Sequence, residues 1–208
     1  MLSKISKIGI LTSGGDAPGM NAAIRSLVRS ADFNNVEIIG IKRGFQWLIE
    51  GAFEKLEMRS VSNILKTGGT FLRSARSKDF LHKKARNLAY QNLQNYGINA
   101  LVVIGGNGSL TGASIFSDEF NIPVVGIPAS IDNDVFGTDF SIGYNTALET
   151  IVESVDKIRD TASSHNRLFF IEVMGRKSGN LALSASLSTG ACFVIIPEKD
   201  FQLIDLVK

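Results

Sequence analysis

Short apolar runs rich in β-branched residues alternate along this chain with segments of helical spacing. The pattern predicts strands at residues 7–12, 36–41, 100–104, 124–127, 167–173 and 193–197. It predicts helices at residues 20–30, 60–65, 83–96, 110–116, 146–160 and 181–189. Strands this apolar, alternating with helices, are typical of a parallel sheet covered on both faces. We therefore expect a doubly wound α/β fold, with a change of pattern, and so a domain boundary, near residues 140–145.

The loops that follow the predicted strands carry most of the unusual residues. In a doubly wound fold ligands gather beyond the carboxyl ends of the strands. Gly14 and Gly15 follow the first strand, and Gly105-Gly106-Asn107-Gly108-Ser109 follows the run ALVVI. Glycines let backbone N–H groups approach an anion, and a helix N-terminus adds favourable partial charge. The first loop matches neither the P-loop nor the GxGxxG pattern, so a tight turn without a ligand stays open as an alternative.

Two further loops carry charged side chains. Asp132 and Asp134 lie in the segment PASIDND, and in an extended loop the side chains at these positions project to the same side. Such a pair binds a cation, or one member acts as a general base toward a substrate hydroxyl. A solvated acidic loop or a helix cap is the alternative. Arg76, Arg167 and Arg176 are candidates for binding a phosphate, or for ordinary surface ion pairs.

Composition narrows the class of protein. The chain has 208 residues, is 44% apolar and has one cysteine, which excludes a disordered tail and a disulfide scaffold. No apolar run approaches the roughly 20 residues of a membrane span, so we expect a cytoplasmic protein. The formal charge is +8 over residues 1–104 and −6 over residues 105–208. Six basic residues lie between Arg73 and Arg86 without aromatic interleaving, which favours a small phosphate ligand over nucleic acid.

Taken together, the loops resemble a known family. The segments TSGGDAPGMNAAIR, GGTFLRSAR, VVIGGNGS, IDNDVFGTD, SSHNR and EVMGR, in this order, are similar to those of ATP-dependent 6-phosphofructokinase, from about residue 6 to Glu198. The resemblance implies transfer of the ATP γ-phosphoryl group to the 1-hydroxyl of fructose 6-phosphate, with Mg²⁺. It also implies an ATP-binding domain over residues 1–143 and the first part of a substrate-binding domain over residues 144–208.

The resemblance assigns roles to individual positions. It implies catalytic roles for Ser130, Asp132 (the base), Asp134 and Arg176. The implied ATP ligands are Gly15, Arg76, Ser77, Gly106, Asn107, Gly108 and Ser109. The implied sugar-phosphate ligands are Ser130, Ile131, Asp132, Arg167, Met174, Gly175 and Arg176. The implied effector ligands, for ADP or phosphoenolpyruvate, are Arg25, Arg29, Arg59, Arg159 and Glu198. Because Arg167 usually reaches a neighbouring subunit in this family, the resemblance implies a homo-oligomer, a tetramer in the family.

Some positions select among related activities or depart from the pattern. Pyrophosphate-using relatives typically carry Asp at Gly108 and Lys at Ala129, so the small residues here favour ATP. Asn107 stands where the family has the Asp that helps to hold Mg²⁺, which predicts a weakened metal site. Arg73 replaces a usual glycine, and the family's chains are longer. These departures leave open a truncated or degenerate homologue that binds nucleotide or effector without turnover.

Overall fold

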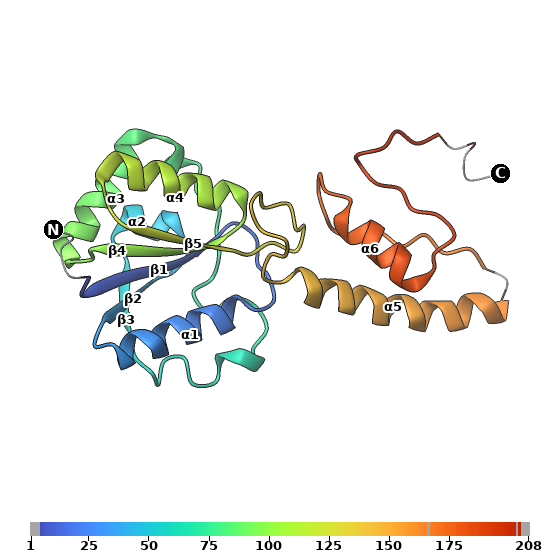
Figure 1. Ribbon diagram of the computed structural model, residues 1–208, viewed down its shortest axis with the longest axis horizontal. Helices are drawn as coiled ribbons and strands as arrows, with labels where there is room; N and C mark the ends of the chain where they lie inside the picture. The colour runs from blue at the N-terminus through green and yellow to red at the C-terminus, as the bar shows by residue number, and fades with distance from the viewer. Residues whose placement is uncertain (1–4, 166, 203, 205–208) are drawn as a thin grey trace. The chain divides into compact units, whose positions relative to one another are not determined.

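The computed structural model describes residues 5–165, 167–202 and 204, and the chain divides into two compact units, residues 1–129 and residues 130–208 (Figure 1). The domain boundary expected after residue 143 stays a prediction.

Unit 1 is built on a five-stranded sheet. Its strands are β1 (Lys7–Ser13), β2 (Glu37–Ile41), β3 (Phe53–Leu56), β4 (Ala100–Gly105) and β5 (Val124–Pro128), in the order β3-β2-β1-β4-β5. All neighbours are parallel except β3, which runs antiparallel to β2 at one edge. The expected mostly parallel α/β sheet is therefore confirmed. The pattern did not predict β3, because only Leu56 of this four-residue strand is buried.

Helices cover both faces of this sheet. α1 (Met20–Phe33) lies on one face, and α2 (Phe45–Glu50), α3 (Lys83–Tyr96) and α4 (Asn107–Phe120) lie on the other (Figure 1). Buried side chains of α2, α3 and α4 form one core with apolar residues of β1, β2 and β4. Short 3₁₀ turns, η1 (Ile64–Lys66) and η2 (Asp79–Leu81), lie in the long connection from β3 to α3.

The helix expected over residues 60–65 is wrong, apart from the η1 turn at its end. The Ser62 hydroxyl donates to the Arg59 carbonyl at 2.9 Å, and the Ser60 hydroxyl accepts from the Glu57 N–H at 3.2 Å. Serine side chains that bond nearby backbone groups favour turns over helix, which explains the difference.

Unit 2 contains α5 (Tyr144–His165) and α6 (Asn180–Thr189), joined by the Tyr144 hydroxyl, which lies 2.6 Å from the Ser184 hydroxyl. The strands expected at residues 167–173 and 193–197 are wrong, since neither segment forms a ladder among the described residues. Both run as irregular chain with exposed apolar side chains; Leu168 is 80% and Phe170 73% exposed. A strand needs a neighbour to pair with its backbone, and sequence pattern alone does not supply one.

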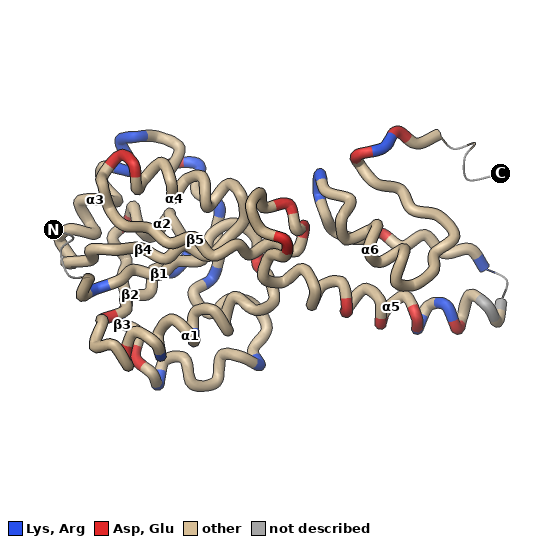
Figure 2. Tube along the Cα trace, viewed as in Figure 1, with Lys and Arg blue, Asp and Glu red and all other residues tan. Residues whose placement is uncertain are grey.

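Charge is distributed unevenly over the described elements. Acidic residues gather in the loop after β5 and along α5, whereas several basic residues lie on the segment leading into α3 (Figure 2). Among the described residues, no helix is long and apolar enough to cross a membrane.

Candidate active site

The two glycine loops of unit 1 lie beside each other at the carboxyl edge of the sheet. Ser13, the last residue of β1, is the register partner of Gly105, the last residue of β4. A Cβ at Gly105 would lie 2.4 Å from the Ser13 carbonyl oxygen, so only glycine permits this approach. α4 begins at Asn107 rather than at residue 110, so Asn107, Gly108 and Ser109 form its first turn. N–H groups at a helix start lack intrahelical partners and favour an anion.

The segment that contains Arg76 joins the same edge. The Thr12 hydroxyl donates to the Arg73 carbonyl at 2.7 Å, and the Gly14 N–H donates to the Ala75 carbonyl at 3.4 Å. Arg73 has a φ of 57°, a left-handed backbone conformation that residues other than glycine rarely adopt. The structure thus brings the predicted nucleotide residues to one edge, namely Gly15, Arg76, Ser77, Gly106, Asn107, Gly108 and Ser109. Their roles stay predictions.

Asn21 and Gln46, which the sequence did not single out, form hydrogen bonds to the connection that carries Arg76 and Ser77. Asn21 of α1 is buried; its Nδ2 donates to the carbonyls of Ile64 and Gly69, and its Oδ1 accepts from the Phe71 N–H at 2.7 Å. The Ser77 hydroxyl lies 2.9 Å from Oε1 of Gln46, on α2. The sequence signal for Asn21 was its position, since it is a polar residue on the face of the predicted helix that carries the buried apolar side chains.

Residues 130–134 of unit 2, the acidic loop, are not the extended segment that the sequence predicted. Ile131 and Asp132 form a turn, and Asn133 is left-handed with a φ of 48°. The strict alternation of side chains therefore does not apply. The Ser130 hydroxyl instead accepts from the Asp132 N–H at 3.3 Å and donates to Oδ1 of Asp134 at 3.2 Å. This hydroxyl links the two acidic residues of the loop.

The loop that carries Gly175 and Arg176 is hydrogen-bonded to the acidic loop. The Ser178 hydroxyl donates to the Asp132 carbonyl at 2.9 Å, and Nδ2 of Asn180 donates to the carbonyls of Asp132 and Asn133 at 3.3 and 3.0 Å. Arg176 is exposed and has a φ of 54°. Ser178 and Asn180 were missed, although Ser-Gly-Asn before an apolar periodic run is typical of a helix start.

The remaining predicted residues are dispersed. Ile131 is half-buried in the acidic loop, Met174 is exposed, and the Arg167 N–H donates to the Ala162 carbonyl at 3.2 Å beyond α5. The structure does not bring these three to a common contact among the described residues.

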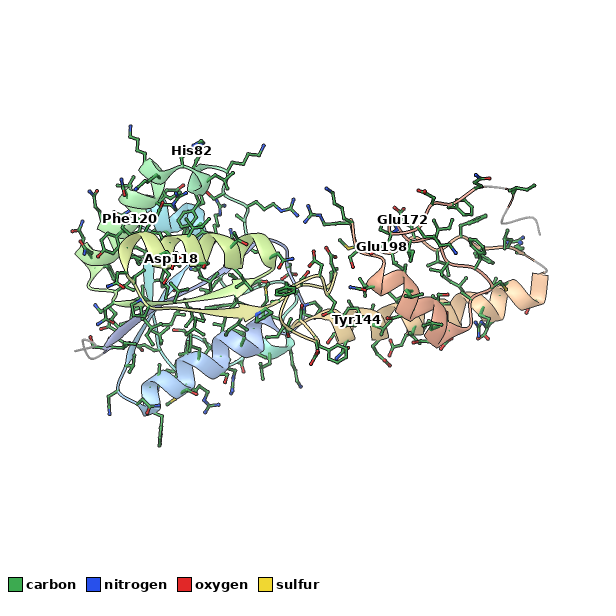
Figure 3. The ribbon with its side chains drawn as sticks, turned by 45° about the horizontal axis from the view of Figure 1, so that its top comes forward. His82, Asp118, Phe120, Tyr144, Glu172 and Glu198 are labelled. Carbon is green, nitrogen blue, oxygen red and sulfur yellow. The ribbon has the colours of Figure 1, made fainter. Side chains whose placement is uncertain are left out.

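The predicted effector residues lie on both units. Arg25 and Arg29 are one turn apart on α1, and Nε of Arg25 is buried without a hydrogen-bond partner in the described part of the chain. Arg59 lies in the turn before η1. In unit 2 the Arg159 guanidinium lies near Gly190, and the Glu198 carboxylate accepts from the Gly179 N–H at 2.7 Å, beside the start of α6 (Figure 3). Their effector role stays a prediction.

The described residues contain no group of three or more His, Cys, Asp or Glu side chains placed to hold a metal ion. Mg²⁺ commonly takes one or two protein oxygens and completes its shell with nucleotide phosphates and waters. Asn107 offers an amide oxygen beside the glycine loops, so the residues fit a magnesium ion carried by a nucleotide and not a protein-only metal site.

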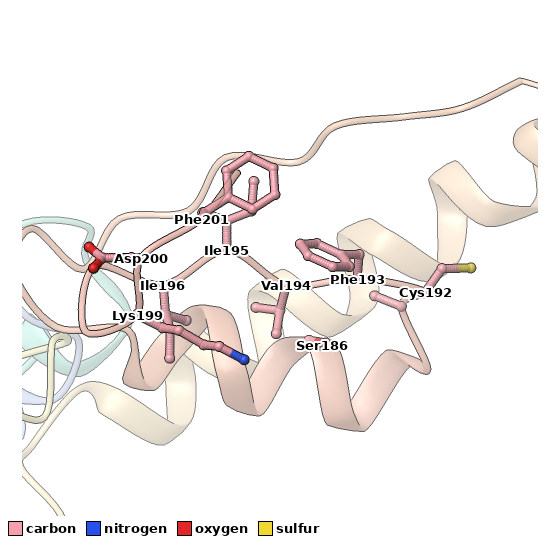
Figure 4. Close-up of a pocket in the computed structure, with 10 residues that line it drawn as sticks. Ser186, Cys192, Phe193, Val194, Ile195, Ile196, Lys199, Asp200 and Phe201 are labelled. Carbon is pink, nitrogen blue, oxygen red and sulfur yellow. The ribbon is translucent and has the colours of Figure 1, made fainter. Parts of the chain in front are cut away.

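A hollow of about 490 Å³ opens in unit 2 between Ser186 of α6 and residues 191–201 (Figure 4). Its lining includes Cys192, Phe193 and Phe201. None of the predicted catalytic, ATP-binding or sugar-phosphate residues lines it, so it belongs to the exposed apolar segments and not to the candidate site.

Known proteins with similar sequences indicate the family of this chain. The family described as Phosphofructokinase matches residues 7–208. An ATP-dependent 6-phosphofructokinase 2 from Bacteroides thetaiotaomicron is 55% identical over 95% of this chain and 60% of its own length. One from Persephonella marina is 53% identical over 98% of this chain and 63% of its own length. The chain thus spans about three-fifths of these relatives.

A solved structure supports the fold. The structure of phosphofructokinase from Saccharomyces cerevisiae matches 93% of this chain and 29% of its own, with a TM-score of 0.88 and 42% sequence identity. The family match covers the sheet, both glycine loops and the acidic loop. The chain belongs to the phosphofructokinase family.

Proposed function

We propose that this chain carries the donor and acceptor sites of an ATP-dependent 6-phosphofructokinase, which moves the γ-phosphoryl group of ATP to the 1-hydroxyl of fructose 6-phosphate. The observation that supports this most strongly is the convergence of two glycine loops and the Arg76 segment at one sheet edge. We also propose that the protein is cytoplasmic and forms a homo-oligomer. In the same proposal, the predicted effector residues bind ADP or phosphoenolpyruvate.

Unit 1 supplies the nucleotide ligands in this proposal. The backbone N–H groups of Gly15 and of Gly108, in the first turn of α4, bind phosphate oxygens, and Arg76 neutralises the charge of those oxygens. The amide oxygen of Asn107 would help to hold a magnesium ion carried by the nucleotide, and that ion would supply charge neutralisation at the transferred group. A Cβ built at Gly108 meets nothing within 4 Å, which leaves space for a nucleotide and supports ATP as the donor.

Unit 2 supplies the acceptor ligands. Asp132 accepts the proton of the 1-hydroxyl as that oxygen attacks, because phosphoryl transfer needs a base and a positioned nucleophile more than covalent participation. Ser130 and Asp134 orient the loop around it. Arg176 and Arg167 bind the sugar phosphate, where a guanidinium matches two phosphate oxygens.

A coupled assay of fructose 1,6-bisphosphate formation tests this proposal. We expect Asp132→Asn to lower kcat by about 10²- to 10⁴-fold, the usual worth of a general base, with the Kd for ATP unchanged. Asp139→Asn is the matched control, since this exposed carboxylate lies in the same loop. Equal rates in wild type and Asp132→Asn would refute the base. Nucleotide binding without any turnover in the wild type would favour a binding-only homologue, to which Asn107 also points.

Asn107 gives a second test. Asn107→Asp adds a negative charge to the amide-oxygen position, so the magnesium concentration for half-maximal ATP binding should fall. We would measure ATP binding by calorimetry across a Mg²⁺ titration. Asn95→Asp, on the exposed face of α3, is the control. An unchanged magnesium dependence would remove Asn107 from the metal ligands.

A further inference from the structure

Arg86 is a buried charge that the proposed chemistry does not use. It lies on α3, is 9% exposed, and forms a two-point ion pair with Glu119 near the end of α4. Its Nε and Nη2 donate to the two carboxylate oxygens at 2.6 and 2.8 Å. An ion pair with two such hydrogen bonds fixes the relative orientation of the two side chains as well as pairing their charges.

The same guanidinium reaches a third element. Nη1 of Arg86 donates to the carbonyls of Phe80 and Leu81, at 2.9 and 2.8 Å. These carbonyls belong to η2, a single 3₁₀ turn that directly precedes α3. One side chain therefore holds α3, α4 and η2 at the same time.

η2 continues into the predicted nucleotide segment. The Phe80 N–H donates to the Ser77 hydroxyl at 3.4 Å, and the Phe80 ring stacks on Phe45 with 4.0 Å between ring centres. Ser77 and the neighbouring Arg76 are proposed ATP ligands. α4, which carries Glu119, also begins with Asn107, Gly108 and Ser109. The Arg86–Glu119 pair thus connects η2, which follows Ser77, to the far end of the helix whose first turn supplies the other proposed nucleotide ligands.

We propose that Arg86, held by Glu119, is a positioning residue that sets the Arg76–Ser77 segment against the start of α4 for nucleotide binding. This inference rests on the proposed function. Arg86 acts through the carbonyls of Phe80 and Leu81 and does not touch the nucleotide. A purely stabilising pair would contribute to unfolding free energy alone, whereas a positioning pair also contributes to nucleotide affinity in the folded protein.

The test compares ATP affinity among folded variants, by calorimetry well below each variant's Tm. We expect Arg86→Gln to weaken ATP binding about tenfold, the equivalent of about 1.4 kcal/mol. Glu119→Gln should weaken it less, because the bonds from Arg86 to the two carbonyls remain. Amide hydrogen exchange over residues 76–81 should speed up in Arg86→Gln. If Arg86→Gln fails to fold, Arg86→Lys, which keeps the charge without the fork, takes its place.

A control separates affinity from stability. Val28→Ala opens a cavity on α1, on the other face of the sheet, and lowers stability without touching η2 or α4. It should leave ATP affinity unchanged. Wild-type affinity in Arg86→Gln, or an equal loss in Val28→Ala, would overturn the positioning role. A wild-type chain that binds no ATP would instead overturn the proposed function itself.

Discussion

Single buried polar side chains decide the local geometry of unit 1. Asn21 is the clearest case, because one amide satisfies two carbonyls and one N–H of the 64–71 connection. A buried backbone group that loses its partner costs roughly 1–3 kcal/mol. The segment that leads to Arg76 therefore depends on a residue of α1 that lies about fifty positions earlier in the chain.

Replacing Asn21 tests that dependence. Asn21→Ala should lower the free energy of unfolding by about 2–3 kcal/mol, since it leaves buried backbone groups unpaired. Urea unfolding measures the change. Ser26→Ala, an exposed position of the same helix, should stay within about 0.5 kcal/mol of wild type. A similarly small effect for Asn21→Ala would mean that water or a shifted loop satisfies these groups.

Among the elements, α4 carries the aromatic centre of one core. Phe116 is fully buried, and its ring lies 5.0 to 6.4 Å from the rings of Phe80, Tyr90 and Phe120, measured between ring centres. Phe116→Ala should lower the free energy of unfolding by about 3–5 kcal/mol, as is usual when a buried ring is removed. Ile115→Ala, at the neighbouring and 42% exposed position, is the control for helix propensity. Equal losses at both positions would disprove this core.

The contact between α3 and α4 makes stability depend on pH. The hydrogen bond from Arg86 lowers the pKa of the Glu119 carboxyl. A folded-state pKa below the unfolded value adds stability above the unfolded pKa, and that stability is lost as the pH falls through the folded pKa. The difference in unfolding free energy between wild type and Glu119→Gln should therefore shrink below the ordinary pKa of glutamate. Urea unfolding across acidic pH would show this, and a constant difference would argue against it.

The elements of unit 1 were predictable where periodicity was strong. The runs at β1, β2, β4 and β5 and the spacing of α1 and α3 led directly to a mostly parallel sheet, but not to the order of its strands. The short α2 and β3 were not, because six and four residues give too little periodicity. In unit 2, apolar composition predicted strands at 167–173 and 193–197, but pairing depends on neighbours that composition does not specify.

The candidate site also has a part that the sequence predicts and a part that it does not. Glycines and charged residues after strands predicted a ligand-binding edge, and the pairing of β1 with β4 brings the two glycine loops together there. Nucleotide binding at this edge stays a prediction. Supporting contacts such as those of Thr12 and Ser178 join residues far apart in sequence. Their partners are backbone carbonyls, which have the same chemistry at every position, so no pattern of residue types points to them.

Taken as a whole, the molecule exposes apolar surface in unit 2. Leu168, Phe170 and Leu187 are each more than 70% exposed, and a hollow opens beside Phe193 and Phe201. Contiguous apolar patches attract other apolar surfaces. We expect the purified chain to bind a hydrophobic dye under native conditions, and the double variant Leu168→Ser/Phe170→Ser to bind less. Dye binding at the level of an ordinary folded control protein would contradict this.

The strand order also has a consequence for synthesis at the ribosome. β1 emerges first but lies in the middle of the sheet, and its second neighbour, β4, does not begin until residue 100. Domains generally fold as units as they emerge. A nascent chain exposing residues 1–95 should therefore remain protease-sensitive, and one exposing residues 1–129 should be protected. Protection of the shorter chain would show that β1, β2 and β3 fold without β4.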